Sequence, residues 1–131
     1  MITKLLQNYP LTLTQASIDS KVAEAKALAK ELFTPEYLKL AFSLIDLTTL
    51  NSTDQLVKGK QFADNVNNFQ SNYKAIPNVA AICVYPPLVK TVKANLKAEG
   101  VGIASVGAGF PSSQTYIDVK VLECKKAVAD G

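Results

Sequence analysis

The sequence predicts an α/β fold in which two N-terminal helices precede three strand–helix units with parallel strands. The clearest sign is the unbroken apolar run Val79–Val84, which is typical of a parallel strand buried on both faces. Segments with helical periodicity separate this run from two further strand candidates, and such alternation implies parallel strands with right-handed crossovers. These units fit a small doubly wound sheet, and they fit part of a (β/α)8 barrel equally well.

The two N-terminal helices are predicted from periodicity and from a start signal. Apolar residues recur with a period of about 3.6 through Thr12–Leu32, with charged residues between them. Thr34 then precedes Pro35, and a threonine cap followed by proline at the first helical position marks a helix start. We expect the second helix to cover Pro35–Ala41.

The strand–helix units follow directly along the chain. The predicted strands are Phe42–Leu47, Val79–Val84 and Val101–Val106. The first helix between them is expected to start after a turn at 51–54 and to end near Asn67, with a polar loop over 67–78. The later helices are expected over Leu88–Ala98 and from about Gln114 to Ala129. We expect one domain over residues 1–131, with the N-terminal helices in 1–41 and the strand–helix units in 42–131.

Composition indicates a globular chain. Hydrophobic residues make up 48% and charged residues 19% of the 131 residues, which excludes intrinsic disorder. No apolar run approaches the roughly 20 residues of a membrane-spanning helix, and the N-terminus carries no signal-peptide pattern. We therefore expect a cytoplasmic protein without a membrane partner, in which Cys83 and Cys124 are reduced thiols.

Missing residue types exclude several functions. The chain has no histidine, so Ser-His-Asp and Cys-His catalysis within it are excluded, and we expect no metal site because most zinc sites need histidine. The net charge of +3 comes from lysines spread over the helices, and the chain has no arginine. Without arginine forks for bases or phosphates, we expect no nucleic-acid partner.

Polar residues at the predicted strand ends are the candidate site residues. Sites in parallel α/β folds lie at the carboxyl ends of strands, where Asp46 and Thr48 follow the first strand and Cys83 ends the second. By period-two alternation, Asp46 and Cys83 can both point into a barrel interior. Structural alternatives remain open, because Asp46 also fits a carboxylate that caps backbone N–H groups and Cys83 an inert apolar residue. Thr48 and Thr49 also fit a strand end that caps a turn.

Two other features carry less weight. The segment Gly107–Pro111 reads G-A-G-F-P, but it lacks the third glycine of a dinucleotide-binding loop and follows the third strand. A Schiff-base lysine needs a desolvated or cation-flanked position, whereas the predicted strands contain no lysine. The lysines are therefore expected on solvated helix faces.

Four segments are more specific together than any of them alone. They read I-D-L-T-T-L at 45–50, A-A-I-C-V-Y-P at 80–86, I-A-S-V-G-A-G-F-P at 103–111 and Y-I-D-V-K-V-L-E-C-K-K-A-V-A-D-G at 116–131. In this order and spacing, over roughly Leu38–Gly131, they resemble the deoxyribose-phosphate aldolase family. The resemblance implies that the fold is a TIM barrel, that is, a (β/α)8 barrel, and that the complete protein is a class I aldolase. Such an enzyme cleaves 2-deoxyribose 5-phosphate to glyceraldehyde 3-phosphate and acetaldehyde through a lysine imine, without a cofactor.

The resemblance also implies roles for individual residues. Asp46 and Thr48 resemble first-strand residues that order substrate hydroxyls and water, and Cys83 matches a second-strand thiol that is not the obligatory nucleophile. The family's Schiff-base lysine, its neighbouring lysine, its relay aspartate and its phosphate-binding loops all belong to later strands. We therefore expect this chain to be the N-terminal portion of the barrel, inactive alone because the Schiff-base lysine is absent.

Two other functions remain open, and an assembly is expected. The chain also fits a non-catalytic, self-associating partial-barrel module or a small flavodoxin-like binding domain.

Three parallel strands leave two unpaired sheet edges, so we expect a homo-oligomer, most simply a dimer. A phosphorylated sugar is expected as a partner only of the complete barrel. Leu44, Ala81 and Ile103 are expected to face the barrel interior, and Cys83 is expected to be more accessible than Cys124.

Overall fold

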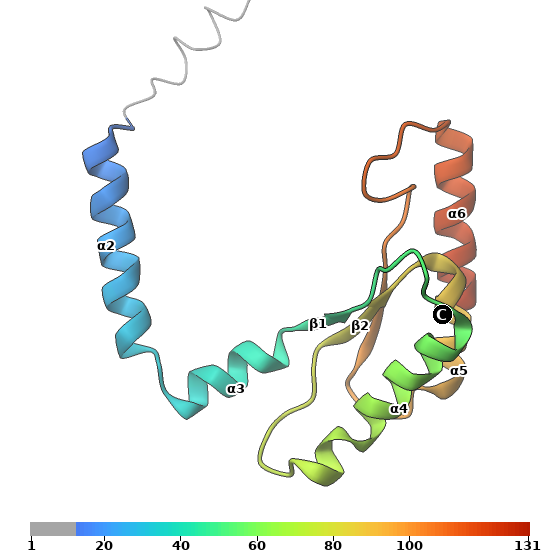
Figure 1. Ribbon diagram of the computed structural model, residues 1–131, viewed down its shortest axis with the longest axis horizontal. Coiled ribbons are helices and arrows are strands. Elements are labelled where there is room, and N and C mark those ends of the chain that lie inside the picture. The colour runs from blue at the N-terminus through green and yellow to red at the C-terminus, as the bar shows by residue number, and fades with distance from the viewer. Residues whose placement is uncertain (1–12) are drawn as a thin grey trace, which may run out of the picture. The chain divides into compact units, whose positions relative to one another are not determined.

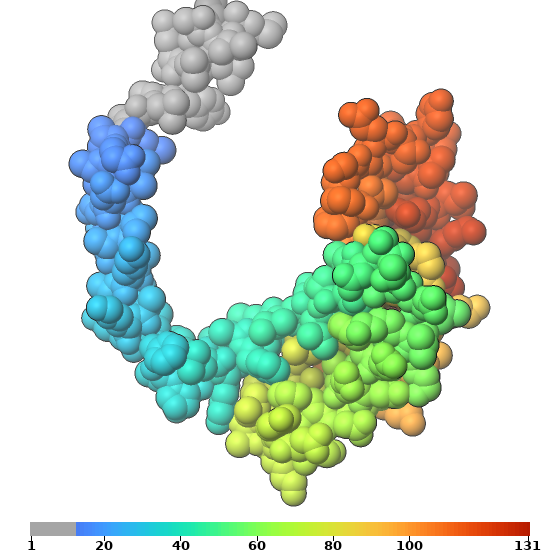
Figure 2. Space-filling model, viewed as in Figure 1, coloured from blue at the N-terminus to red at the C-terminus, as the bar shows by residue number. Residues whose placement is uncertain are grey.

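The computed structural model describes residues 13–131, which form two compact units divided after Tyr37 (Figures 1 and 2). The first unit contains α2 (Gln15–Glu31), and α3 (Pro35–Ser43) crosses the division. Thr14 caps α2, because its hydroxyl accepts a hydrogen bond from the Ser17 N–H at 3.2 Å. Both predicted N-terminal helices are confirmed, although the expected start at Thr12 lies outside the described residues.

The second unit contains the strand–helix units in the predicted order. Its elements are β1 (Asp46–Thr48), α4 (Leu56–Asn72), β2 (Ala81–Val84), the 3₁₀ turn η1 (Pro86–Leu88), α5 (Val89–Asn95), β3 (Gly102–Ser105) and α6 (Ile117–Asp130). Two helices are shorter than predicted, since α5 ends at Asn95 instead of Ala98 and α6 begins at Ile117 instead of near Gln114. Two other boundaries were also wrong: residues 42–43 end α3 instead of opening a strand, and α4 continues through 68–72, where a loop was expected. These last two places meet in one contact, since the Phe42 ring stacks on that of Phe69 at 5.2 Å between centroids. This tertiary contact favours helix at both places over the local pattern.

The three strands form one parallel sheet in the order β1-β2-β3. Thr48 lies beside Cys83, and Cys83 lies beside Ala104. One step towards the amino ends of the strands, Asp46 lies beside Ala81. Because paired residues of neighbouring strands point to the same side of a sheet, all of these side chains share one face.

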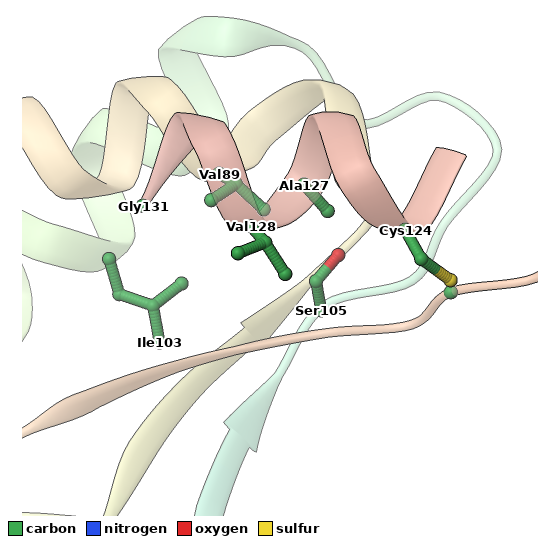
Figure 3. Close-up of a pocket in the computed structure, with 8 residues that line it drawn as sticks. Val89, Ile103, Ser105, Cys124, Ala127, Val128 and Gly131 are labelled. Carbon is green, nitrogen blue, oxygen red and sulfur yellow. The ribbon is translucent and has the colours of Figure 1, made fainter. Parts of the chain in front are cut away.

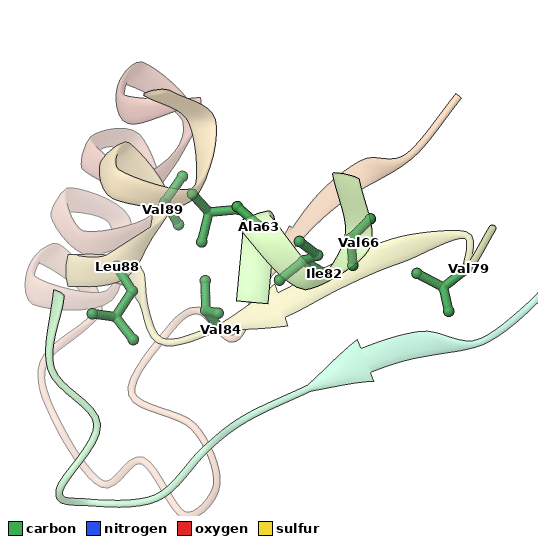
Figure 4. Close-up of a cluster of buried hydrophobic side chains, with 8 residues drawn as sticks. Ala63, Val66, Val79, Ile82, Val84, Leu88 and Val89 are labelled. Atoms are coloured by element: carbon green, nitrogen blue, oxygen red, sulfur yellow. The ribbon is translucent and has the colours of Figure 1, made fainter. Parts of the chain in front are cut away.

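The opposite face of the sheet carries the hydrophobic core (Figure 4). Ile82 and Val84 of β2 are fully buried against α4 and α5. The other buried members of the core are Ala63, Val66, Val79, Leu88, Val89 and Val92. Polar contacts reinforce this packing, since the Asn67 side chain on α4 accepts hydrogen bonds from the N–H groups of Lys97 and Ala98 at 2.7 and 3.0 Å.

The face opposite the core is not covered by any helix among residues 38–131. Asp46 and Thr48 are exposed there, and Ala81 and Cys83 are half-buried. The expectation that Ile103 shares this face was wrong, because Ile103 lies beside Ile82 and packs on the core side. Its one-residue offset follows from β3 beginning at Gly102.

Candidate functional site

Asp46, Thr48 and Cys83 come together on the uncovered face of the sheet. Asp46 and Thr48 are the first and last residues of β1, two positions apart, and Cys83 lies directly beside Thr48 on β2. Neighbouring strands lie roughly 4.8 Å apart, so a carboxylate, a hydroxyl and a thiol sit within one small patch. The sequence suggested that Asp46 follows the first strand, whereas in the structure Asp46 is the first residue of β1. The side chains nonetheless share the face that alternation predicted.

The Asp46 carboxylate is free to act on a ligand. It is exposed, and within residues 13–131 it takes part in no hydrogen bond or ion pair. The neighbouring Thr48 hydroxyl donates to the backbone carbonyl of Asp46 at 2.9 Å. The structure therefore does not use this carboxylate to cap backbone N–H groups, and its hydration offsets the cost that burial of a charge would carry.

Thr49, in contrast, is a buried structural residue. It is 5% exposed, and its hydroxyl donates to the Asp54 carboxylate at 2.7 Å. The Asn51 N–H donates to the same carboxylate at 3.0 Å. The Thr49 hydrogen bond is the main cause that lowers the pKa of Asp54 below its ordinary value, against a smaller opposing effect of desolvation. Capping of a turn, one of the two interpretations of the threonine pair, thus holds for Thr49.

The loop after β1 is tied to the end of β2. The Thr49 N–H donates to the Cys83 carbonyl at 3.0 Å. The Tyr85 hydroxyl donates to the Leu50 carbonyl at 3.3 Å. These two bonds hold the carboxyl ends of β1 and β2 together, so they fix where Thr48 and Cys83 stand relative to each other. The sequence pattern placed Tyr85 just after the predicted strand Val79–Val84 and did not reveal this positioning contact.

The two thiols differ from expectation in their exposure. Both cysteines are free, but Cys83 is half-buried whereas Cys124 on α6 is exposed. The prediction that Cys83 is the more accessible thiol was wrong. Cys83 lies on the central strand between Thr48 and Ala104, which flank its side chain. The part of α6 that carries Cys124 faces a groove beside β3 (Figure 3).

Apolar grooves line α6 and not the polar patch. One groove of about 440 Å³ lies between β3 and α6, and Ile103, Ser105, Cys124 and Val128 are among the residues that line it (Figure 3). A second lies along the same helix and is lined by Val121 together with Cys124 and Val128. Neither groove is lined by Asp46, Thr48 or Cys83, so both are separate from the polar patch.

The patch contains no lysine and no cluster of metal-ligating side chains among the described residues. Within residues 13–131 no lysine lies on a strand, and none is buried. The same residues contain no cluster of three acidic or cysteine side chains that could hold a metal ion. No helix in the described part of the chain is long and apolar enough to cross a membrane. The patch can therefore order the hydroxyls of a small polar ligand, but it contains no amine nucleophile.

This arrangement defines a class: an α/β protein with parallel strand–helix units and polar side chains on the sheet face opposite its helices. Comparisons with known proteins agree. The chain is 32% identical to deoxyribose-phosphate aldolase of Homo sapiens and 31% identical to that of Mus musculus, in each case over 99% of this chain and 43% of the relative. A crystal structure described as a "putative deoxyribose-phosphate aldolase" from Coccidioides immitis has the same fold, with a TM-score of 0.59 at 22% identity over 92% of this chain and 46% of that one. No family model matches the chain.

Over almost its whole length, the chain is a homologue of the deoxyribose-phosphate aldolases. It spans less than half the length of the curated relatives that it matches. The resemblance recognised from the four sequence motifs is confirmed at the level of family.

Proposed function

We propose that this chain supplies the first three βα units of a deoxyribose-phosphate aldolase barrel, and with them the substrate-ordering wall of its site. In this role Asp46 and Thr48 orient the hydroxyls of a phosphorylated deoxy sugar and a water molecule, and Cys83 borders the same space. The observation that carries the proposal is the homology over 99% of the chain together with the exposed, unpartnered Asp46 carboxylate. The proposed setting is the cytoplasm, in keeping with two free thiols.

The strand order supports a barrel over a doubly wound sheet. A doubly wound sheet reverses its strand order at a switch point and carries helices on both faces. Here the order runs β1-β2-β3 without reversal, and α4 and α5 pack on the same face. Sequential parallel strands with helices on one side are the repeating unit of a (β/α)8 barrel. The flavodoxin-like alternative has no comparable support.

The distribution of lysines supports inactivity of the chain alone. Imine chemistry needs a lysine that is neutral enough to attack a carbonyl, which requires desolvation or a neighbouring cation. Lys58 and Lys120 are half-buried on helices, and the other described lysines are exposed. No described lysine therefore stands in the patch of Asp46, Thr48 and Cys83. We propose that the amine nucleophile comes from a part of the barrel beyond these units.

Two measurements test the proposal. The chain alone is incubated with acetaldehyde and borohydride, and intact mass is expected to show no stoichiometric adduct, while full-length human deoxyribose-phosphate aldolase under the same conditions is expected to be trapped. In the second measurement, residues 1–131 replace the homologous segment of the human enzyme. This chimera is expected to cleave 2-deoxyribose 5-phosphate.

Variants of the chimera then test the individual residues. Loss of a hydrogen bond to a charged group costs about 1.5–3 kcal/mol, so Asp46→Asn is expected to lower kcat/KM by about 10- to 150-fold. Asp118→Asn, at an exposed carboxylate in the first turn of α6, is the matched control and is expected to leave kcat/KM unchanged. A folded chimera without activity, or an Asp46→Asn variant as active as the control, contradicts the proposal.

A further inference from the structure

The loop between β3 and α6 has an uncommon backbone conformation (Figure 1). Ala108 and Gly109, which are consecutive, both have a positive φ, at 57° and 73°. Glycine adopts this left-handed conformation readily, whereas a residue with a β-carbon, such as Ala108, adopts it only at a cost in free energy. Such a conformation persists where the surrounding structure holds it, so contacts with the rest of the fold must stabilise this loop.

Two charged side chains of α6 make these contacts. The Glu123 carboxylate accepts a hydrogen bond from the Gly109 N–H at 2.8 Å. The Lys120 ammonium, about one turn earlier on the same helix, donates to the Ser113 carbonyl at 3.2 Å. Both side chains belong to half-buried residues. Hydrogen bonds to charged groups are stronger than those between neutral groups, so α6 holds the loop that precedes it at two points.

The two glycines of the loop allow close packing. A β-carbon on Gly109 would lie 2.5 Å from the Ser113 hydroxyl oxygen, and one on Gly107 would lie 3.1 Å from the Cys124 sulfur. Gly109 therefore lets the loop fold back on itself, and Gly107 lets it lie against α6. This explains both glycines of the G-A-G-F-P segment without a dinucleotide ligand.

The loop lies at the carboxyl end of the sheet, where the polar patch also ends. Ala104 lies beside Cys83. Two residues further on, the Val106 N–H donates to the Val84 carbonyl at 3.2 Å, and the loop then leaves β3. The helix that holds the loop, α6, also packs against η1, which follows the end of β2. Binding sites of parallel α/β folds lie at this end of the strands, so a ligand that covers Cys83 and extends past the strand ends meets this loop.

We propose that Glu123 is a positioning residue of the candidate site: its carboxylate holds the loop after β3 in the conformation in which the loop forms one wall of that site. This inference rests on the proposed function, because it assigns the loop to the same site. In this role Glu123 touches no reacting atom and acts through Gly109. A wall that takes no part in the reaction binds substrate and transition state equally, so release of the loop raises KM and leaves kcat nearly unchanged.

Amide hydrogen exchange, read residue by residue by NMR, tests the contact in the chain itself. The Gly109 amide is expected to exchange about 10-fold faster or more in Glu123→Ala, because a hydrogen bond to a charged group is lost. Glu123→Gln keeps an acceptor oxygen and is expected to retain most of the protection. Glu99→Ala is the matched control, since Glu99 is exposed and takes part in no hydrogen bond or ion pair within residues 13–131. Circular dichroism establishes that each variant is folded.

Kinetics of the chimera with the human enzyme test the effect on the site. Glu123→Ala is expected to raise KM for 2-deoxyribose 5-phosphate several-fold with kcat nearly unchanged, and Glu123→Gln is expected to restore KM. Gly109→Ala disturbs the same loop from its other side and is expected to raise KM in the same way. The two alanine changes together are expected to raise KM little more than either alone, because both release one loop.

Different outcomes contradict this inference and the proposed function. Unchanged exchange of the Gly109 amide in Glu123→Ala overturns the role of Glu123 in holding the loop. In an active chimera, an unchanged KM of Glu123→Ala, or a loss confined to kcat, overturns the positioning role and leaves the proposed function intact. A folded chimera without activity contradicts the proposed function, and the positioning role is then wrong as well.

Discussion

Replacement of Ile82 tests whether β2 is the centre of the core. Ile82 is 0% exposed, lies on the central strand and packs between α4 and α5. Ile82→Ala removes three buried carbons, worth about 2.4 kcal/mol in transfer free energy. The cavity left behind raises the total loss in the free energy of unfolding to about 2–5 kcal/mol. Ile82→Val, which removes one carbon, is expected to cost about 0.5–1.5 kcal/mol.

Urea unfolding followed by far-UV circular dichroism measures these losses. With a urea slope of about 1–3 kcal/mol per molar, Ile82→Ala is expected to lower the midpoint by about 1 M or more, or to leave the chain unfolded without urea. Ile117→Ala is the matched control, because Ile117 is 75% exposed, and about 0.6 kcal/mol is expected from its buried quarter. Fixed protein concentration removes any effect of assembly. Equal losses for Ile82→Ala and Ile117→Ala would refute the assignment of β2 as the buried centre.

Two further predictions concern polar contacts. Asn67→Ala removes three hydrogen bonds, one from α4 to the end of α5 and two to the segment after it, and is expected to cost about 1–3 kcal/mol in urea unfolding. Asn68→Ala removes one exposed bond and is expected to cost clearly less. Equal losses would contradict the role of Asn67. The pKa of Asp54 is lower in the folded chain than in the unfolded chain, where it is about 3.9. The ionised carboxylate therefore stabilises the fold above that pH. This contribution disappears as pH falls through the lower pKa of the folded chain. In urea unfolding, the unaltered chain is expected to be more stable than Asp54→Ala at pH 6, and this difference in the free energy of unfolding is expected to shrink at pH 2. A difference that grows in acid would contradict the reasoning.

Much of the fold was predictable because local patterns and the tertiary structure agree. The apolar run that ends at Val84 forms the central strand, and the Thr34–Pro35 signal starts α3 where expected. Part of the candidate patch was also predictable, since alternation places Asp46 and Thr48 on one face of their strand. That Cys83 shares this face follows from the register of β1 with β2. Errors arose at Phe42 and in the last turn of α4, where a ring stack between distant residues determined the structure.

The sequence by itself determined the α/β class, the order of elements, the family resemblance and the absence of histidine chemistry. These properties depend on residue types and on periods of two and about 3.6, which are local and additive along the chain. Only the tertiary structure decided that Thr49 is a buried turn residue, that Ile103 faces the core and that Cys124 is the more exposed thiol. These three outcomes depend on strand register and on which surfaces find a partner, and both are set by contacts between residues far apart in the sequence.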